Sequence, residues 1–287
     1  MLYYYIKTNL EKPMRIKQSD LLQSFRFIAP GILFYSLLNI FFKSFSFSTN
    51  AVLLLFLFSA FSAFLITGKK YLPMILSTLL AVGSVSFLLT IGQGVFQQYF
   101  MIFASFLFII TMIGLSRFFT PQEERPSEEK LRILDSGFNL NQTIVLFSLF
   151  FLSSGIYGIY SIANIRPWQM TLIMFAGVFL ASYYLIRINF LKSRELELHL
   201  DYYKNRSFNF YSFLLALVMV ELVWVMIFLP INHLTFGAII LTVFYTYWDI
   251  VRNHLRSALT KRKFIVALAF AVIATSVILA TSKLYIN

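Results

Sequence analysis

Long apolar runs separated by short polar segments repeat along the whole chain. A helix needs about 20 mostly apolar residues to cross a hydrocarbon core of roughly 30 Å, and it satisfies its own backbone hydrogen bonds in lipid. The runs lack the alternation that is typical of barrel strands. We therefore predict an all-α, polytopic transmembrane helix bundle of about nine spans. The predicted spans cover residues 27–42, 50–67, 71–91, 99–116, 143–163, 167–186, 210–229, 234–250 and 264–282.

The composition agrees with a chain that is embedded along its whole length. Hydrophobic residues make up 59% of the 287 residues and charged residues only 13%, whereas soluble domains are about a quarter charged. There is no cysteine, which excludes disulfides, thiol catalysis and thiolate metal sites. We recognise no secretory signal in the first residues, and translation from Met14 instead of Met1 is an open alternative.

Lysine and arginine fall almost entirely in alternate connections between the predicted spans. Lys43, Arg166 and Lys283 are the exceptions, and all other basic residues lie in the N-terminal segment or in the second, fourth, sixth and eighth connections. Cytoplasmic connections carry an excess of basic residues. We therefore predict a cytoplasmic N-terminus and an external C-terminus. The net charge of +12 then reflects topology and does not indicate a nucleic-acid partner.

Three cytoplasmic segments are long enough to have structure of their own. The first ends either in a short interfacial helix at 19–26 or in an early start of the first span. Residues 120–137 predict a surface helix that Ser127 caps and Gly137 ends. Residues 194–208 fit either a strand-like stretch or a continuation of the sixth span. The predicted division of the chain is 1–26 cytoplasmic, 27–116 spans one to four, 117–142 cytoplasmic, 143–186 spans five and six, 187–209 cytoplasmic and 210–287 spans seven to nine.

Glu221 is the acidic residue that stands inside an apolar run, MVELVWVMIF, near the middle of the seventh span. A central acid costs about 3 kcal/mol on insertion scales. Protonation or a hydrogen bond to a facing helix would lower this cost. Thr242 and Tyr245 lie at the same depth in the antiparallel eighth span, so a structural interpretation pairs Glu221 with one of these hydroxyls. The alternatives are a proton or cation relay and a polar contact to another membrane helix.

A second polar cluster lies at the cytoplasmic end of the eighth span, in the segment YWDIVRNHLR. Asp249 and Arg252 are spaced i,i+3 and share a helix face. The cluster fits either an orientation anchor in the aromatic belt or a head-group or phosphate site. The candidate inner-interface residues are Asp249, Arg252, His254, Arg256 and Lys261.

No established catalytic motif occurs, and the three histidines lack metal-ligand spacing. We predict no catalytic residue, metal or cofactor. The leading hypothesis is a non-enzymatic scaffold or subunit of a membrane assembly. Its predicted partners are the bilayer, anionic lipid head groups at the cytoplasmic face and another membrane protein. The alternatives are a small-solute or ion transporter using Glu221, and an enzyme on lipid-linked substrates, which would need a groove opening sideways to lipid beside Asp249 and Arg252.

Small residues spaced by four predict faces on which helices approach closely, as at Ser154 and Gly158 or at Ala267 and Ala271.

The last fifth of the chain resembles the C-terminal part of uncharacterised multi-pass membrane proteins of bacteria. The resemblance lies in the segment LPINHL at 229–234, in Tyr245, and in the segments RNHL at 252–255 and LTKR at 259–262. It implies a bacterial inner (plasma) membrane and carries over no catalytic residue.

The charge distribution makes a direct prediction about the two ends of the chain. Reporter tags at the N-terminus and at the C-terminus should lie in opposite compartments, because an odd number of spans separates them. Tags found in the same compartment would contradict the nine-span topology.

Overall fold

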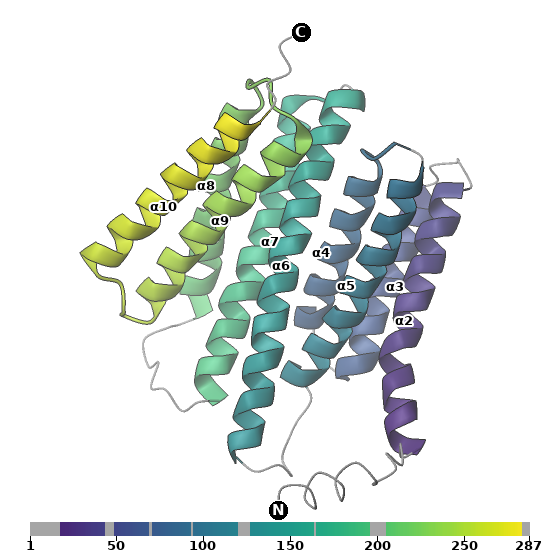
Figure 1. The fold of residues 1–287 in the computed structure, drawn as a ribbon. Helices are drawn as coiled ribbons and strands as arrows, with labels where there is room; N and C mark the ends of the chain where they lie inside the picture. Colours follow the sequence, from purple (N-terminus) through teal and green to yellow (C-terminus); the bar gives the residue numbers. More distant parts are fainter. Residues whose placement is uncertain are drawn as a thin grey trace, which may run out of the picture.

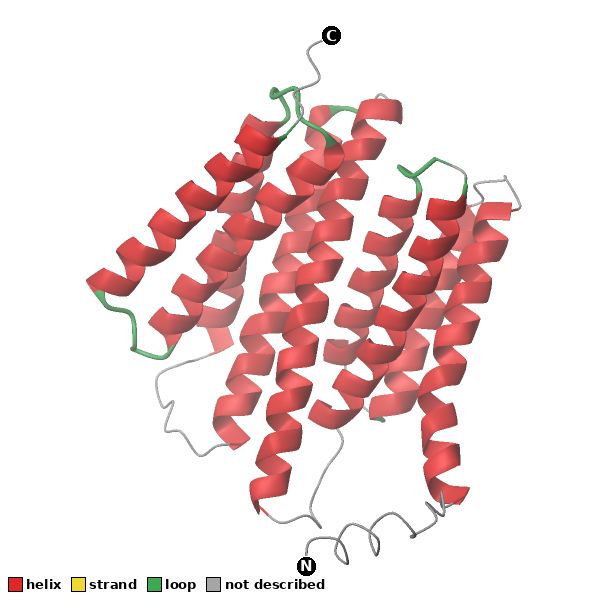
Figure 2. Cartoon of the chain, in the orientation of Figure 1, coloured by secondary structure: helices red, strands yellow, loops and turns green. Residues whose placement is uncertain are grey.

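Helices make up every regular element of the described residues, as Figure 2 shows. The computed structural model describes residues 18–43, 49–68, 71–92, 94–119, 127–163, 165–195 and 205–282. The helices within these ranges are α2 (Gln18–Lys43), α3 (Thr49–Thr67), α4 (Tyr71–Leu88), α5 (Val95–Phe119), α6 (Ser127–Ala163), α7 (Pro167–Glu195), α8 (Asn205–Met226), α9 (His233–Leu255) and α10 (Lys261–Thr281).

Eight of the described helices are long and apolar enough to cross a membrane. The apolar part of α3, Val52–Thr67, is shorter, and at about 1.5 Å per residue it would span less than the hydrocarbon core. The helix order matches the predicted spans one for one. The structure therefore confirms a polytopic helical bundle, in which α3 has the shortest apolar stretch of the described helices.

The helix α6 occupies the centre of the bundle. It packs against α4, α5, α7 and α9, and Figure 1 shows it between the helices α2–α5 and the helices α7–α10. The helix α10 lies at the edge, where it packs mainly against α9. Its residues are exposed or half-buried throughout. Side chains of α6 are thus shielded on most sides, whereas the C-terminal edge of the bundle offers its surface to lipid or to a partner.

Glycines allow the two central helices to approach closely. An added Cβ at Gly83 of α4 would lie 2.6 Å from the carbonyl oxygen of Ser148 in α6. A Cβ at Gly155 of α6 would overlap the backbone of Ser86 and Phe87 in α4. The backbone cannot move aside as a side chain can, so only glycine fits at these positions. Close approach at small residues is the mode of packing that membrane helices favour.

The small-residue faces predicted in the fifth span are also used. Gly158 packs against the side chain of Thr90, and Ser154 packs against Gly237 of α9. In α10, Ala267 and Ala271 are half-buried, whereas Leu268 and Val272 are exposed. The spacing by four therefore marks the faces on which these helices meet their neighbours.

Helix boundaries differ from the prediction at two places. The first helix starts at Gln18 and continues to Lys43, which is the early start and not a separate interfacial helix. The helix α6 runs unbroken from Ser127 to Ala163, so Gly137 does not end a surface helix. Gly137 instead lies where an added Cβ would meet the Phe118 backbone at 3.0 Å, and close packing explains the glycine.

Residues 196–204 lie outside the described residues, so the alternatives for 194–208 stay open.

We expect Gly155→Ala to lower the free energy of unfolding by about 1–3 kcal/mol, the usual cost of overpacking. The cost should outweigh the gain in helix propensity of about 1 kcal/mol, because α4 must move away from α6. The melting temperature of the purified protein in one detergent measures the effect. Gly92→Ala is the control, since an added Cβ at Gly92 meets no atom within 4 Å. Equal melting temperatures for the two variants would contradict the close packing.

Candidate functional site

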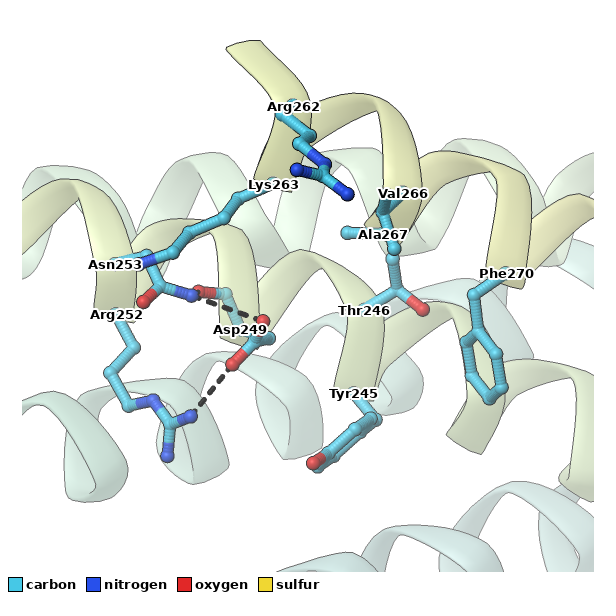
Figure 3. A pocket seen from close by; sticks show the side chains of 10 residues that line it. All are labelled: Tyr245, Thr246, Asp249, Arg252, Asn253, Arg262, Lys263, Val266, Ala267 and Phe270. Atoms are coloured by element: carbon cyan, nitrogen blue, oxygen red, sulfur yellow. Dashed lines mark hydrogen bonds and ion pairs between the residues drawn. The ribbon is translucent and has the colours of Figure 1, made fainter. Parts of the chain in front are cut away.

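Asp249 organises a polar cluster near the end of α9. One carboxylate oxygen accepts a hydrogen bond from Arg252 Nη2 at 2.7 Å, and the other accepts one from Asn253 Nδ2 at 3.1 Å (Figure 3). The Asn253 amide also donates to the Asp249 backbone carbonyl at 2.9 Å. The three side chains are brought together because they lie three and four residues apart on one helix. The i,i+3 pairing predicted from the sequence is therefore formed.

A groove of about 630 Å³ lies between this cluster and the first half of α10. The α10 wall carries Arg262 and Lys263 from the first turn and apolar side chains further along (Figure 3). Val266, Phe270 and Tyr245 are exposed at the surface, and α10 is an edge helix, so the groove opens sideways out of the bundle. Its lining residues are Tyr245, Thr246, Asp249, Arg252, Asn253, Arg262, Lys263, Val266, Ala267 and Phe270.

The connection between the two helices places the first turn of α10 over the cluster. Ser257 adopts φ 53°, a left-handed conformation that costs a residue with a side chain about 1 kcal/mol. The Ala258 N–H then donates to the carbonyl of Asn253 at 2.9 Å. Thr260 caps α10 by accepting from the Lys263 N–H at 3.3 Å, and Lys263 Nζ donates to the Ala258 carbonyl at 3.1 Å. These bonds fix the entry of α10 relative to α9.

His254 and Arg256 point away from the groove and tether α9 to its neighbours. Arg256 Nη2 donates to Asn189 Oδ1 of α7 at 2.7 Å, and His254 Nε2 lies 3.2 Å from the Tyr211 hydroxyl of α8. Asn189 is buried, so Arg256 satisfies an acceptor that water does not reach. Burial lowers the pKa of the Arg256 guanidinium from its ordinary value, and the charge of Arg252 acts in the same direction.

The groove thus contains some of the predicted inner-interface residues and not others. Asp249 and Arg252 line it, together with Tyr245, whereas His254, Arg256 and Lys261 do not. Arg262 and Lys263 also line the groove, and they were not among the residues predicted from the sequence. Their spacing to Val266, Ala267 and Phe270 is that of one helix face, a signal that the sequence contains. It could be interpreted only once α9 was known to lie beside that face.

Glu221 does not form the contact with α9 that the sequence suggested. It is exposed on α8, and within the described ranges it makes no hydrogen bond or ion pair. Thr242 donates instead to the Ala238 carbonyl at 2.8 Å, and Tyr245 lines the groove. Glu221 lies about one and a half turns before Met226, the last residue of α8. It is therefore nearer to that end than the middle position predicted from the sequence.

The chemistry of the groove favours binding of an anion. Arg252, Arg262 and Lys263 supply three positive charges against the one carboxylate of Asp249. That carboxylate already accepts hydrogen bonds from Arg252 and Asn253. Among the described residues, no group of three or more His, Asp or Glu could hold a metal ion.

A double-mutant cycle on Asn189 and Arg256 tests the tether between α7 and α9. Asn189→Leu and Arg256→Leu should each destabilise the protein, and the double variant should lose less than the sum. Each single variant loses the same hydrogen bond, so the double variant loses it only once. The expected coupling is about 1–2 kcal/mol, because the bond involves a charged group that is partly exposed. Unfolding free energies in one detergent give the coupling, and strictly additive losses would contradict the bond.

Comparisons with protein-family models, with curated protein sequences and with solved structures find no match to this chain.

Proposed function

We propose that this integral membrane protein is a non-enzymatic subunit of a membrane assembly. It binds another membrane protein through the exposed face of α8 and presents a basic cytoplasmic end to anionic lipid. The observation that carries the proposal is Glu221, a carboxylate exposed on a membrane-spanning helix without a partner in the described part of the chain.

The surroundings of Glu221 make a lipid-exposed carboxylate costly. Exposed Leu217 and Val225 lie one turn before and after it, and exposed Trp224 lies beside it on the same face. A charged acid in hydrocarbon costs up to about 3 kcal/mol on insertion scales. A facing helix that supplies a hydrogen-bond donor or a basic side chain would offset much of this cost, and polar contacts between membrane helices contribute about 0.6–2 kcal/mol each.

The exposed face of α8 is also suited to protein contact by its side chains. Aromatic residues, with Trp foremost, contribute much of the binding energy at protein interfaces. Phe213 and Trp224 lie near the Glu221 face of α8, and Phe228 lies in the turn after the helix, where its ring contacts that of Trp224. A partner helix packed on this face would bury them around a central polar contact, which would also fix the register of the two helices.

The basic end of the bundle supports the second part of the proposal. The lower ends of the helices in Figure 1, with those of α9 and α10 at the left, carry Arg117, Arg132, Lys192, Arg252 and Lys261. With the positive-inside tendency, this end faces the cytoplasm. The proposed setting is a bacterial inner membrane, in line with the resemblance at the C-terminal end. Anionic lipid head groups attract juxtamembrane basic residues by about 1 kcal/mol each.

The two alternatives are supported less well. A transport path through the middle of this bundle would not contain Glu221, because the carboxylate lies on the outer surface of α8. The sideways groove at Asp249 and Arg252 meets the geometric condition for an enzyme on lipid-linked substrates. It contributes one carboxylate, however, where general acid and base catalysis by carboxylates usually needs two. The groove therefore favours binding over catalysis.

Site-specific photo-cross-linking in the native membrane tests the α8 contact. A photoreactive residue at position 217 or 225 should give a discrete protein adduct of defined mass, since both positions flank Glu221. The same probe at position 106 is the control, because Phe106 is equally exposed on α5 in the opposite half of the bundle. It should label lipid alone.

The role of the carboxylate is tested by two substitutions in the same assay. Glu221→Gln retains hydrogen-bonding capacity and should preserve the adduct, whereas Glu221→Leu removes it and should abolish the adduct. Lipid labelling at all three positions, together with a monodisperse monomer in mild detergent, would contradict the proposal. An adduct of twice the chain mass would replace the separate partner with a second copy of this chain.

A further inference from the structure

Arg262 and Lys263 line the groove, and with Lys261 they form a first turn of α10 whose three cations lack a counter-charge within the described residues. Arg262 makes no hydrogen bond or ion pair there, and Lys263 Nζ bonds to a neutral carbonyl, that of Ala258. Two other basic residues at this end form ion pairs. Lys192 pairs with Asp135 at 2.6 Å, and Arg252 pairs with Asp249 at 2.7 Å. The groove therefore retains positive charge after its internal ion pair is counted.

Placing cations at the start of a helix is unfavourable in itself. The helix dipole makes the N-terminus positive and favours an anion there. Yet α10 begins with Lys261, Arg262 and Lys263 and has no acidic residue in its first turn. The positive-inside tendency explains basic residues at this end of the membrane. It does not explain why two of them line a groove with Arg252, whose buried Nε has no acceptor within the described residues.

The groove changes from polar to apolar along its length. Arg262 and Lys263 lie at the start of α10, and Val266, Ala267 and Phe270 follow on the same wall. Phe270 is the eighth residue after Arg262, so the wall extends about 12 Å along the helix. Because α10 is long and apolar enough to cross a membrane, its cationic start would lie at the membrane interface and the apolar wall would reach into the hydrocarbon region. A phosphate with attached acyl chains has the same order of polarity.

We infer that the groove between α9 and α10 binds one anionic phospholipid. Its phosphate lies against Arg262, Lys263 and Arg252, and an acyl chain follows Val266, Ala267 and Phe270. Basic pockets between membrane helices at the cytoplasmic side are known to bind such head groups. A soluble anion would fill the cationic end and leave the apolar wall uncovered, which is why a lipid fits the groove better. This site deepens the proposed contact of the basic end with lipid, and it does not depend on Glu221.

Native mass spectrometry of the purified, delipidated full chain tests the site. Titration with phosphatidylglycerol should give one tightly bound lipid per chain, and phosphatidylcholine of the same chain length should bind more weakly. Arg262→Gln with Lys263→Gln should weaken the first binding step for phosphatidylglycerol by about tenfold or more, since each basic residue contributes about 1 kcal/mol. The matched control is Lys261→Gln with Arg132→Gln. It removes the same charge from basic-end residues that do not line the groove, and it should weaken this step much less than the groove variant does.

A second pair of variants probes the apolar wall without changing charge. Ala267→Phe places a large side chain in the groove and should weaken lipid binding, whereas Ala269→Phe on the exposed side of α10 should not. Melting temperatures of both variants without lipid show whether each is folded. If Ala267→Phe is unfolded, the charge variants alone test whether the groove binds the lipid.

The outcomes separate this site from the wider proposal. Equal binding of the two lipids would overturn both the groove and the lipid contact of the basic end. A preference for phosphatidylglycerol that falls equally in the groove variant and in the control variant would contradict lipid binding in the groove. The proposed lipid contact of the basic end would then still stand. Displacement of the bound lipid by an equal concentration of inorganic phosphate would show that the site binds a soluble anion. This result would contradict the inference that the groove binds a phospholipid.

Discussion

Backbone and side-chain polar groups in hydrocarbon must find their hydrogen-bond partners within the protein. This constraint makes every described regular element a helix and decides where its polar side chains point. Several buried hydroxyls inside the bundle donate to a carbonyl of their own helix. Ser148 donates to the Ile144 carbonyl at 2.8 Å, and Ser212 donates to the Phe208 carbonyl at 2.8 Å. Such bonds let small polar residues lie inside the bundle with a satisfied hydroxyl. The Ser154 hydroxyl, which packs against Gly237, has no hydrogen-bond partner among the described residues. Glu221 differs from these residues because it is an acid on the surface of α8, where it makes no hydrogen bond within the described residues.

The number, order and approximate limits of the helices could be predicted from the sequence because hydrophobic length and basic residues are one-dimensional signals. The rotation of each helix about its axis could not. In a soluble helix the apolar stripe marks the buried face, but in a membrane both the lipid-facing and the protein-facing sides are apolar. Leu217 of α8 is exposed and Leu215 is buried, and nothing in their chemistry distinguishes them. The pairing of Glu221 with Thr242 or Tyr245 failed for this reason, since matching depth says nothing about facing direction.

Polar residues at helix ends could be predicted better than those in mid-membrane. Asp249, Arg252 and Asn253 are spaced within one helical turn, so their contacts follow from local geometry. Arg262 and Lys263 join them across a short connection, which required knowledge of how α10 folds back beside α9. Gly137 shows the converse problem. A glycine after a polar helix is typical of a helix end, but here the close approach to α5 explains the residue, and a single sequence does not distinguish these two causes.

The arrangement of the helices separates stability from binding. The helices α4 and α6 meet through glycines whose replacement would force backbones apart, so this central contact tolerates little change and leaves no space for a ligand. The edge helices have the opposite properties. Most residues of α10 are exposed and none is buried, and the main support of α10 is α9. A helix held on one side can shift relative to its neighbour at a small cost in packing, so the width of the groove should depend on what occupies it. A bound phospholipid would then stabilise α10 as well as neutralise its first turn, because it would contact both walls at once. The proposed phospholipid would thus be part of the packing at the C-terminal edge, where α9 is the main support of α10.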